Sequence, residues 1–93
     1  MKNSNETPEG VKQKQDGLYL SGGHWLYIQD GVAYWDINDC PQLLVITCGM
    51  PITCVTDEKT RKRKFFIRSQ DLIDANWCEA EIREACAAMG VKP

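Results

Sequence analysis

Histidine and paired cysteines are scarce in this sequence, and their scarcity excludes several kinds of site. The chain has a single histidine, His24, and its five cysteines include no Cys-x-x-Cys pair. A structural zinc site needs four such ligands held together, and a nucleophilic cysteine needs a base beside it. No phosphate-binding Gly-Lys-Ser/Thr motif is present either. We therefore predict no metal, no cofactor and no catalytic residues, and we expect that the protein is not an enzyme.

Long apolar runs are also lacking. The longest stretch of large aliphatic residues is 43–46, far short of the roughly 20 residues that a membrane-spanning helix needs. The residues after Met1 are polar and have no apolar core typical of an export signal, and the number of cysteines is odd. We expect reduced thiols, a cytoplasmic location and no contact with a membrane.

Net charge is small, at −2 near neutral pH, which argues against a purely electrostatic binder of nucleic acid. The distribution of charge is uneven, however. Residues 59–68 carry six basic side chains and no acidic ones, whereas residues 17–58 and 69–93 together carry two basic and ten acidic side chains. The sequence therefore predicts a positively charged tip on an acidic body.

The polar N-terminal segment is expected to stand apart from the rest of the chain. Residues 1–16 contain one large aliphatic side chain, Val11. Such a segment buries too little apolar surface to offset the entropy that is lost when it becomes ordered. We predict a flexible tail over 1–16, followed by a single domain over 17–93.

The strongest local signal is Asp30-Gly31, which lies between two apolar runs of alternating pattern. Asp-Gly is favoured in two-residue hairpin turns because both turn residues adopt positive φ. Such a turn places Tyr27 opposite Tyr34 and sends successive side chains to opposite faces. One face of the hairpin then carries Leu26, Ile28, Ala33, Trp35 and Ile37. The other face carries Trp25, Tyr27, Val32, Tyr34 and Asp36.

Other apolar runs predict further strands at 18–20, 43–48, 52–56 and 64–68. The run at 43–48 is continuously apolar, which is typical of a strand covered on both faces. A series of strands that precedes any helix indicates an α+β domain. We predict a small antiparallel twisted sheet, or partly open barrel, of five to six short strands with a C-terminal helix packed on one face.

Helical patterns begin after the last strand. Ser69 is expected to cap a short helix over 70–74, and the pair Asn76 and Glu79 to cap a longer helix that ends at Gly90. One apolar stripe runs along the longer helix and contains Cys78, Ile82, Ala85, Cys86 and Met89. Because free cysteine packs like a small apolar residue, we interpret these thiols as core residues.

The aromatic side chains Trp25, Tyr27 and Tyr34 are the candidate protein-binding residues. A contiguous patch formed by three large aromatic side chains usually marks an interface. Two alternatives are that a second layer of the fold covers the face, or that nucleic-acid bases stack on it. We expect a regulator or inhibitor that contacts another protein, of the kind that phages and mobile elements encode. A homodimer through the same face is a variant of this hypothesis.

The basic cluster supports an alternative function, binding of nucleic acid. The candidate residues are Lys59, Arg61, Lys62, Arg63, Lys64 and Arg68. Basic side chains beside aromatic ones, here Phe65 and Phe66, suit the binding of phosphates and unpaired bases. Charged hairpin tips also serve solubility and protect strand edges, so the pattern alone does not decide between these roles.

Overall fold

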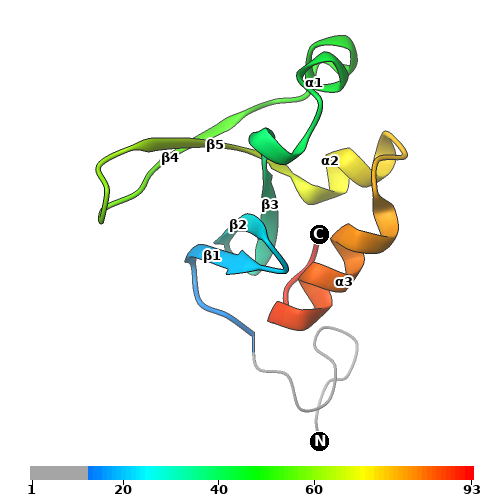
Figure 1. Ribbon diagram of the computed structural model, residues 1–93. Coiled ribbons are helices and arrows are strands. Elements are labelled where there is room, and N and C mark those ends of the chain that lie inside the picture. The colour runs from blue at the N-terminus through cyan, green and yellow to red at the C-terminus, as the bar shows by residue number, and fades with distance from the viewer. Residues whose placement is uncertain (1–12) are drawn as a thin grey trace, which may run out of the picture.

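The computed structural model describes residues 13–93. Its strands are β1 (Gly17–Ser21), β2 (His24–Gln29), β3 (Val32–Asp36), β4 (Thr53–Thr56) and β5 (Arg63–Arg68). Its helices are the 3-10 turn η1 (Ile37–Asp39) and the α-helices α1 (Gln42–Cys48), α2 (Ser69–Asp74) and α3 (Glu79–Met89). Figure 1 shows the strands in one curled layer, with α2 and α3 side by side against it and α1 projecting from one end.

The β2–β3 hairpin confirms the prediction made from Asp30-Gly31. Both turn residues have positive φ, 55° at Asp30 and 77° at Gly31. The register pairs Tyr27 with Tyr34 and Leu26 with Trp35. A second two-residue turn, Gly22-Gly23, joins β1 to β2, and its positive φ values of 58° and 85° are those that glycine adopts most easily.

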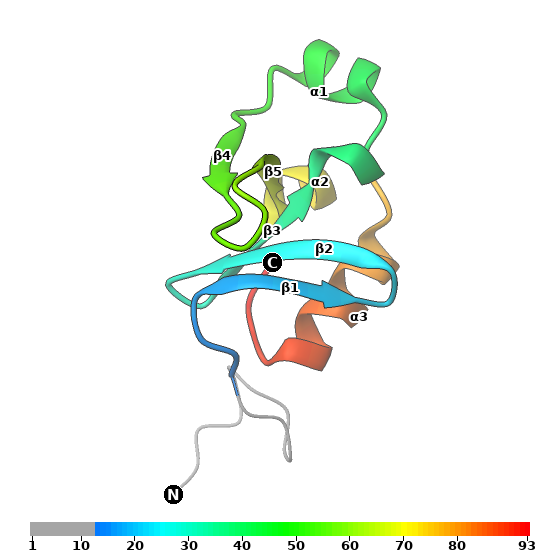
Figure 2. The ribbon, with the colours of Figure 1, turned by 60° about the vertical axis from the view of Figure 1, so that its left-hand side comes forward.

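All five strands form one antiparallel sheet in the order β1-β2-β3-β5-β4. The sheet is strongly curled, so that the β4–β5 hairpin turns away from the plane of β1 and β2 (Figure 2). Strands β1 and β4 are its two edges. This arrangement confirms the predicted α+β fold, with five strands and the C-terminal helix α3 on one face.

The core lies between the sheet and the helices. Leu26, Ile28, Ala33 and Trp35 have at most 1% of their surface exposed, and they pack with side chains from α2 and α3, among them Leu72, Ile82 and Cys86. The predicted inner face of the hairpin is therefore the core face. Each large side chain buried there contributes about 1.5–3 kcal/mol before the entropy of ordering is counted. Ile37 lies in η1, half-buried against the same cluster.

The prediction of a buried strand at 43–48 is wrong, because these residues form the helix α1. A continuous apolar run has no period, so it does not distinguish a strand from a short helix. The residues on either side favour the helix: Pro41 sets its first turn, and Gly49 ends it in the left-handed conformation, at φ 63°. Within α1 only Val45 is buried, whereas Leu43 and Ile46 face solvent.

The predicted caps of α2 and α3 are also wrong. Ser69 is the first residue of α2 and is buried, and the N-cap position is occupied by Arg68, which makes no capping hydrogen bond. The helix α3 begins at Glu79 after Cys78, whose φ is 42°, and no side chain caps it. Cys78 is exposed and lies outside the helix, so it does not belong to the apolar stripe. The chain turns sharply before α3, and this turn sets where the helix begins.

The rest of α3 follows the predicted pattern. Ile82, Cys86 and Met89 are buried, and Gly90 ends the helix at φ 68°. The C-terminal residues then return to the sheet, where the Lys92 amide donates to the Gly31 carbonyl at 2.9 Å and the Lys92 carbonyl accepts from the Ala33 amide at 2.7 Å. These bonds attach the end of the chain to the β2–β3 turn.

The predicted tail falls largely outside the described residues. Its last four residues, 13–16, are exposed and lie beside the turn and the end of α3. The Lys14 amide donates to the Met89 carbonyl at 3.0 Å, and the Asp16 carboxylate accepts from the Asp30 amide at 3.0 Å. The chain is therefore attached to the domain from residue 14 onward.

Candidate interaction surface

The candidate aromatic residues lie on the sheet face opposite the helices. Trp25, Tyr27 and Tyr34 are all half-buried. Beside them, Leu20 on the edge strand β1 pairs with Trp25 and is 60% exposed. We call this surface, Leu20 with the three aromatic residues, the aromatic face. Neither α2 nor α3 covers this face, because both helices pack on the other side of the sheet.

Phe66 explains why the aromatic face is only partly exposed. The register of β3 with β5 places Phe66 on the same face as Tyr34, and its side chain is completely buried. Its ring centre lies 5.9 Å from that of Tyr27, which in turn lies 5.8 Å from Tyr34. The curl of the sheet thus brings these rings together. The rings of this face therefore pack against one another instead of forming a flat, fully exposed patch.

The basic cluster divides between the two faces of β5. Arg63 shares the helix-side face with Phe65 and Ile67, whereas Lys64 and Arg68 share the aromatic face with Phe66. The Lys64 ammonium lies 4.7 Å from the centre of the Trp25 ring, a cation–π contact. Two of the six basic candidates, Lys64 and Arg68, therefore lie on the same surface as the aromatic candidates, which the sequence treats as separate.

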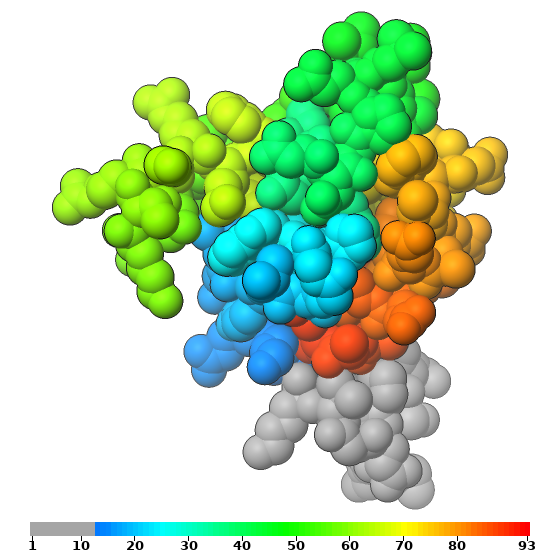
Figure 3. Space-filling view, viewed as in Figure 1, coloured from blue at the N-terminus to red at the C-terminus, as the bar shows by residue number. Residues whose placement is uncertain are grey.

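The remaining basic residues form the projecting tip of the β4–β5 hairpin. Lys59, Arg61 and Lys62 are exposed there. Asp57 builds the turn, because its carboxylate accepts from the Lys59 amide at 3.0 Å and its amide donates to the Lys62 carbonyl at 2.8 Å. In the space-filling view this tip and α1 both project beyond the rest of the molecule (Figure 3). The predicted positively charged tip is therefore present.

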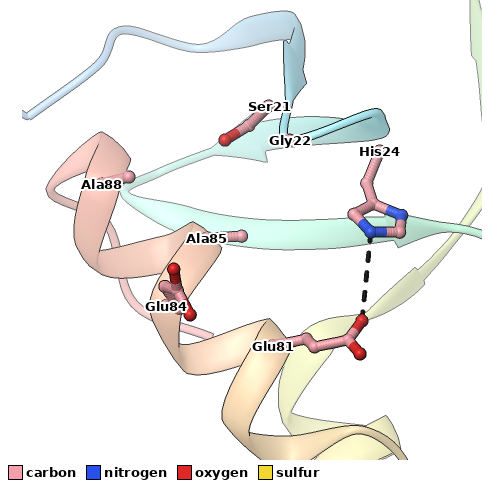
Figure 4. Close-up of a pocket in the computed structure, with 7 residues that line it drawn as sticks. All are labelled: Ser21, Gly22, His24, Glu81, Glu84, Ala85 and Ala88. Carbon is pink, nitrogen blue, oxygen red and sulfur yellow. Dashed lines mark ion pairs between the residues drawn. The ribbon is translucent and has the colours of Figure 1, made fainter.

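His24 lies in a pocket that sequence reasoning did not identify (Figure 4). Its Nδ1 is 3.4 Å from an Asp39 oxygen, its Nε2 is 3.9 Å from a Glu81 oxygen, and its ring lies 4.7 Å from that of Trp35. The pocket, of about 250 Å³, is lined by Ser21, Gly22, His24, Glu81, Glu84, Ala85 and Ala88. The imidazole thus links β2 to η1 and α3. Its partners are distant in sequence, so no local motif indicates the pocket.

The five free cysteines fall into two classes. Cys40 and Cys86 are buried, whereas Cys48, Cys54 and Cys78 are exposed. Burial, with the nearby charges of Asp39 and Asp36, raises the pKa of Cys40 to about 12. Burial likewise raises the pKa of Cys86 to about 11. Both buried thiols therefore stay protonated and unreactive near neutral pH.

Raising the pH above about 9 is expected to destabilise the fold through Cys40 and Cys86. Above the ordinary thiol pKa the unfolded chain loses protons that the folded chain retains, so the free energy of unfolding falls as the pH rises. Urea denaturation at pH 8 and pH 10.5 measures this fall, which should be smaller in the double variant Cys40→Ala/Cys86→Ala. The matched control Cys48→Ala/Cys78→Ala should keep the wild-type fall. An equal fall in both double variants contradicts this assignment.

The most exposed apolar side chains are on α1, where sequence reasoning placed a buried strand. Leu43 is 71% exposed and Ile46 is 74% exposed. The pair Pro41 and Gly49 around this run is the signal that could have identified a helix. The solvent exposure of Leu43 and Ile46, however, depends on the projection of α1 from the body of the molecule, which no local pattern encodes.

No family model, curated protein or solved structure matches this chain. Within residues 13–93, no three histidine, cysteine, aspartate or glutamate side chains are grouped so that they could hold a metal ion. None of the helices in this part of the chain is long and apolar enough to cross a membrane. Function therefore has to be inferred from the surfaces themselves.

Proposed function

We propose that this protein is a small non-enzymatic binding protein, a regulator or inhibitor that contacts another protein through the aromatic face. The observation that carries this proposal is the position of Trp25, Tyr27 and Tyr34. They are half-buried on the side of the sheet away from the helices, next to the 60% exposed Leu20. Tryptophan and tyrosine are the residues that most often dominate the energy of a protein interface.

The charge around the aromatic face indicates the chemistry of the partner. Lys64 contacts Trp25, and Arg68 pairs in register with Tyr34. The aromatic rings are therefore bordered by positive charge, although the rest of the domain is acidic. A partner segment with apolar side chains and flanking carboxylates fits this surface. Its rate of association should fall as salt is added, because exposed charges are screened.

Alanine variants of the aromatic face test this proposal. Trp25→Ala and Tyr34→Ala should leave the melting transition close to that of wild type and remove the proteins that the wild-type domain captures from a lysate of the cells that produce it naturally. Each captured protein is then purified, and its affinity is measured by calorimetry. Phe65→Ala is the matched control, because Phe65 is exposed on the other face of β5. The proposal fails if capture is unchanged, or if either variant melts the domain.

A second candidate function is the binding of single-stranded nucleic acid, which the contact between Lys64 and Trp25 specifically favours. A surface that combines aromatic rings with lysine and arginine allows bases to stack while phosphates are neutralised. We propose this function as the alternative. The exposed tip residues would extend the same surface along a nucleic-acid strand.

Fluorescence anisotropy with a labelled oligonucleotide of about 20 residues tests the alternative. Binding should fall steeply between low and high salt, because bound phosphates release counterions. Lys62→Glu with Lys64→Glu should abolish it, because Lys64 contacts Trp25 and Lys62 is exposed at the adjoining tip. Failure to bind single- or double-stranded oligonucleotides at low salt removes the alternative and leaves the protein-binding proposal intact.

A further inference from the structure

The edge strand β1 lies directly beside the aromatic face. It pairs with β2 on one side and ends the sheet on the other, among residues 13–93. Figure 2 shows it along the outside of β2. Edge strands present backbone groups that pair readily with another chain, and proteins usually protect them with lysine, proline or a bulge. The sequence of β1, Gly-Leu-Tyr-Leu-Ser, contains neither lysine nor proline, and its register with β2 has no bulge.

The register of β1 with β2 identifies the backbone groups that point outward. A two-residue turn closes on a hydrogen-bonded pair, here Ser21 with His24, and bonded and non-bonded pairs then alternate along the two strands. Leu18 and Leu20 fall in non-bonded pairs, so their amides and carbonyls point away from β2. No other backbone hydrogen bond within residues 13–93 uses these groups. Both leucines can therefore bond to an added strand without losing a bond to β2.

The side chains of the same two leucines lie on the side of the sheet that carries the aromatic face. In the register Leu18 is opposite Tyr27 and Leu20 is opposite Trp25, and residues that are directly opposite share a face. Leu20 is 60% exposed and Leu18 is half-buried. A strand added at β1 would therefore extend the aromatic face, with every second side chain next to these leucines.

Lysine side chains lie on both sides of the sheet near this edge. The Lys64 ammonium contacts the Trp25 ring on the aromatic face. The Lys14 ammonium lies 5.9 Å from the centre of the ring of Tyr19, the β1 residue whose side chain is on the opposite face. Neither ammonium group is paired with a carboxylate of residues 13–93. A strand that fits this edge therefore carries carboxylates.

We propose that an extended, acidic segment of the partner protein pairs with β1 as a sixth strand and places alternate apolar side chains beside Leu18 and Leu20. This inference rests on the proposed function and specifies the conformation of the partner. A helix is excluded, because its backbone groups are already bonded to one another and cannot pair with a strand edge. A second copy of β1 fits less well, because its five residues carry no carboxylate to meet Lys14 and Lys64.

A display library of random peptides supplies the probe for a direct test. Peptides selected on the full wild-type chain should carry apolar residues at every second position and be enriched in aspartate and glutamate. When a selected peptide is bound, hydrogen exchange of the Leu18 and Leu20 amides should slow at least about tenfold, because both amides gain a bond. The amides of β4, at the other edge of the sheet, should exchange as before. A library that yields no binder, or unchanged exchange at both leucines, overturns the inference.

Two variants of Leu20 separate its backbone from its side chain. Leu20→Pro removes the outward amide, and proline is tolerated at edge positions whose amide faces solvent. Leu20→Ala is the matched control, because it removes most of the same side chain but keeps the amide. The dissociation constant of the selected peptide should be at least about tenfold higher for Leu20→Pro than for Leu20→Ala. Circular dichroism verifies that both variants are folded, and equal affinities of the two contradict pairing through β1.

Trp25→Ala distinguishes a failure of this inference from a failure of the proposed function. If Trp25→Ala loses the selected peptide while Leu20→Pro retains it, the aromatic face remains the interface and only the added strand is removed. If both variants bind the peptide as the wild type does, both proposals fail. Hydrogen exchange of the chain without peptide covers the remaining occupant. Protection of Leu18 and Leu20 that increases with the concentration of the chain would assign the edge to a second copy and overturn the inference.

Discussion

Replacement of Trp35 by alanine is expected to destabilise the domain by about 3–5 kcal/mol, the usual cost of removing a large buried aromatic side chain. Trp35 is 1% exposed on the core face, and the centre of its ring lies 4.7 Å from the centre of the His24 ring. A domain of this size has a total stability of roughly 5–15 kcal/mol. The loss is therefore a large part of the total, and a substantial fraction of the variant should be unfolded at 37 °C. Thermal and urea denaturation followed by circular dichroism measure it.

Trp25→Ala is the control for this experiment, because Trp25 is the same residue type on the neighbouring strand. Its side chain is half-buried on the aromatic face rather than enclosed by the helices. We expect Trp25→Ala to cost clearly less than Trp35→Ala, since a partly exposed ring loses less transfer energy. Equal losses in the two variants, or a cooperative transition of Trp35→Ala close to wild type, would mean that the helix-side face is not the main core.

Phe66→Ala is expected to have the second large effect, again about 3–5 kcal/mol. Phe66 is completely buried, yet it lies on the same side of the sheet as the aromatic face. The centre of its ring is 5.9 Å from the centre of the Tyr27 ring. Its removal should leave a cavity beside the Tyr27 ring on this face of the sheet. Because Tyr27 and Tyr34 pack in series with Phe66, the near-ultraviolet circular dichroism of the tyrosines should change as well.

Phe65→Ala provides the matched comparison, since Phe65 is the adjacent residue of the same type and is 43% exposed. Its cost should stay below about 1 kcal/mol, because substitutions at the surface usually change the stability by about 0.5 kcal/mol or less. Similar losses at Phe65 and Phe66 would show that the curled sheet does not enclose Phe66 differently from its neighbour. Chemical denaturation of both variants in the same buffer decides between these outcomes.

Local chemistry made the central hairpin predictable. Asp30-Gly31 has the positive φ values that its turn requires, and the two-residue turn leaves one register available. Alternation then separated Leu26 and Trp35 from Tyr27 and Tyr34, as the structure confirms. The apolar spacing of α3 and its end at Gly90 were predictable for the same reason: each depends on residues within a few positions of one another.

The error at α1 has a different origin. The run 43–46 is equally apolar as a strand or as a helix, so its own pattern does not decide between them. Pro41 and Gly49 on either side favour the helix, but only tertiary structure determines that α1 projects from the body of the molecule. The aromatic and basic candidates show the same limit. The sequence separates Trp25 from Lys64 by the whole of β3, α1 and β4, and the curl of the sheet brings them to 4.7 Å.

By itself, the sequence determined the hairpin, the strands around it, the C-terminal helix and the α+β class, because turn geometry and side-chain periodicity act over a few residues. Tertiary structure alone decided which phenylalanine is buried, that His24 lies between Asp39 and Glu81, and that α1 exposes Leu43 and Ile46. These features depend on the curl of the sheet and on contacts between residues far apart in the chain, which no local pattern specifies.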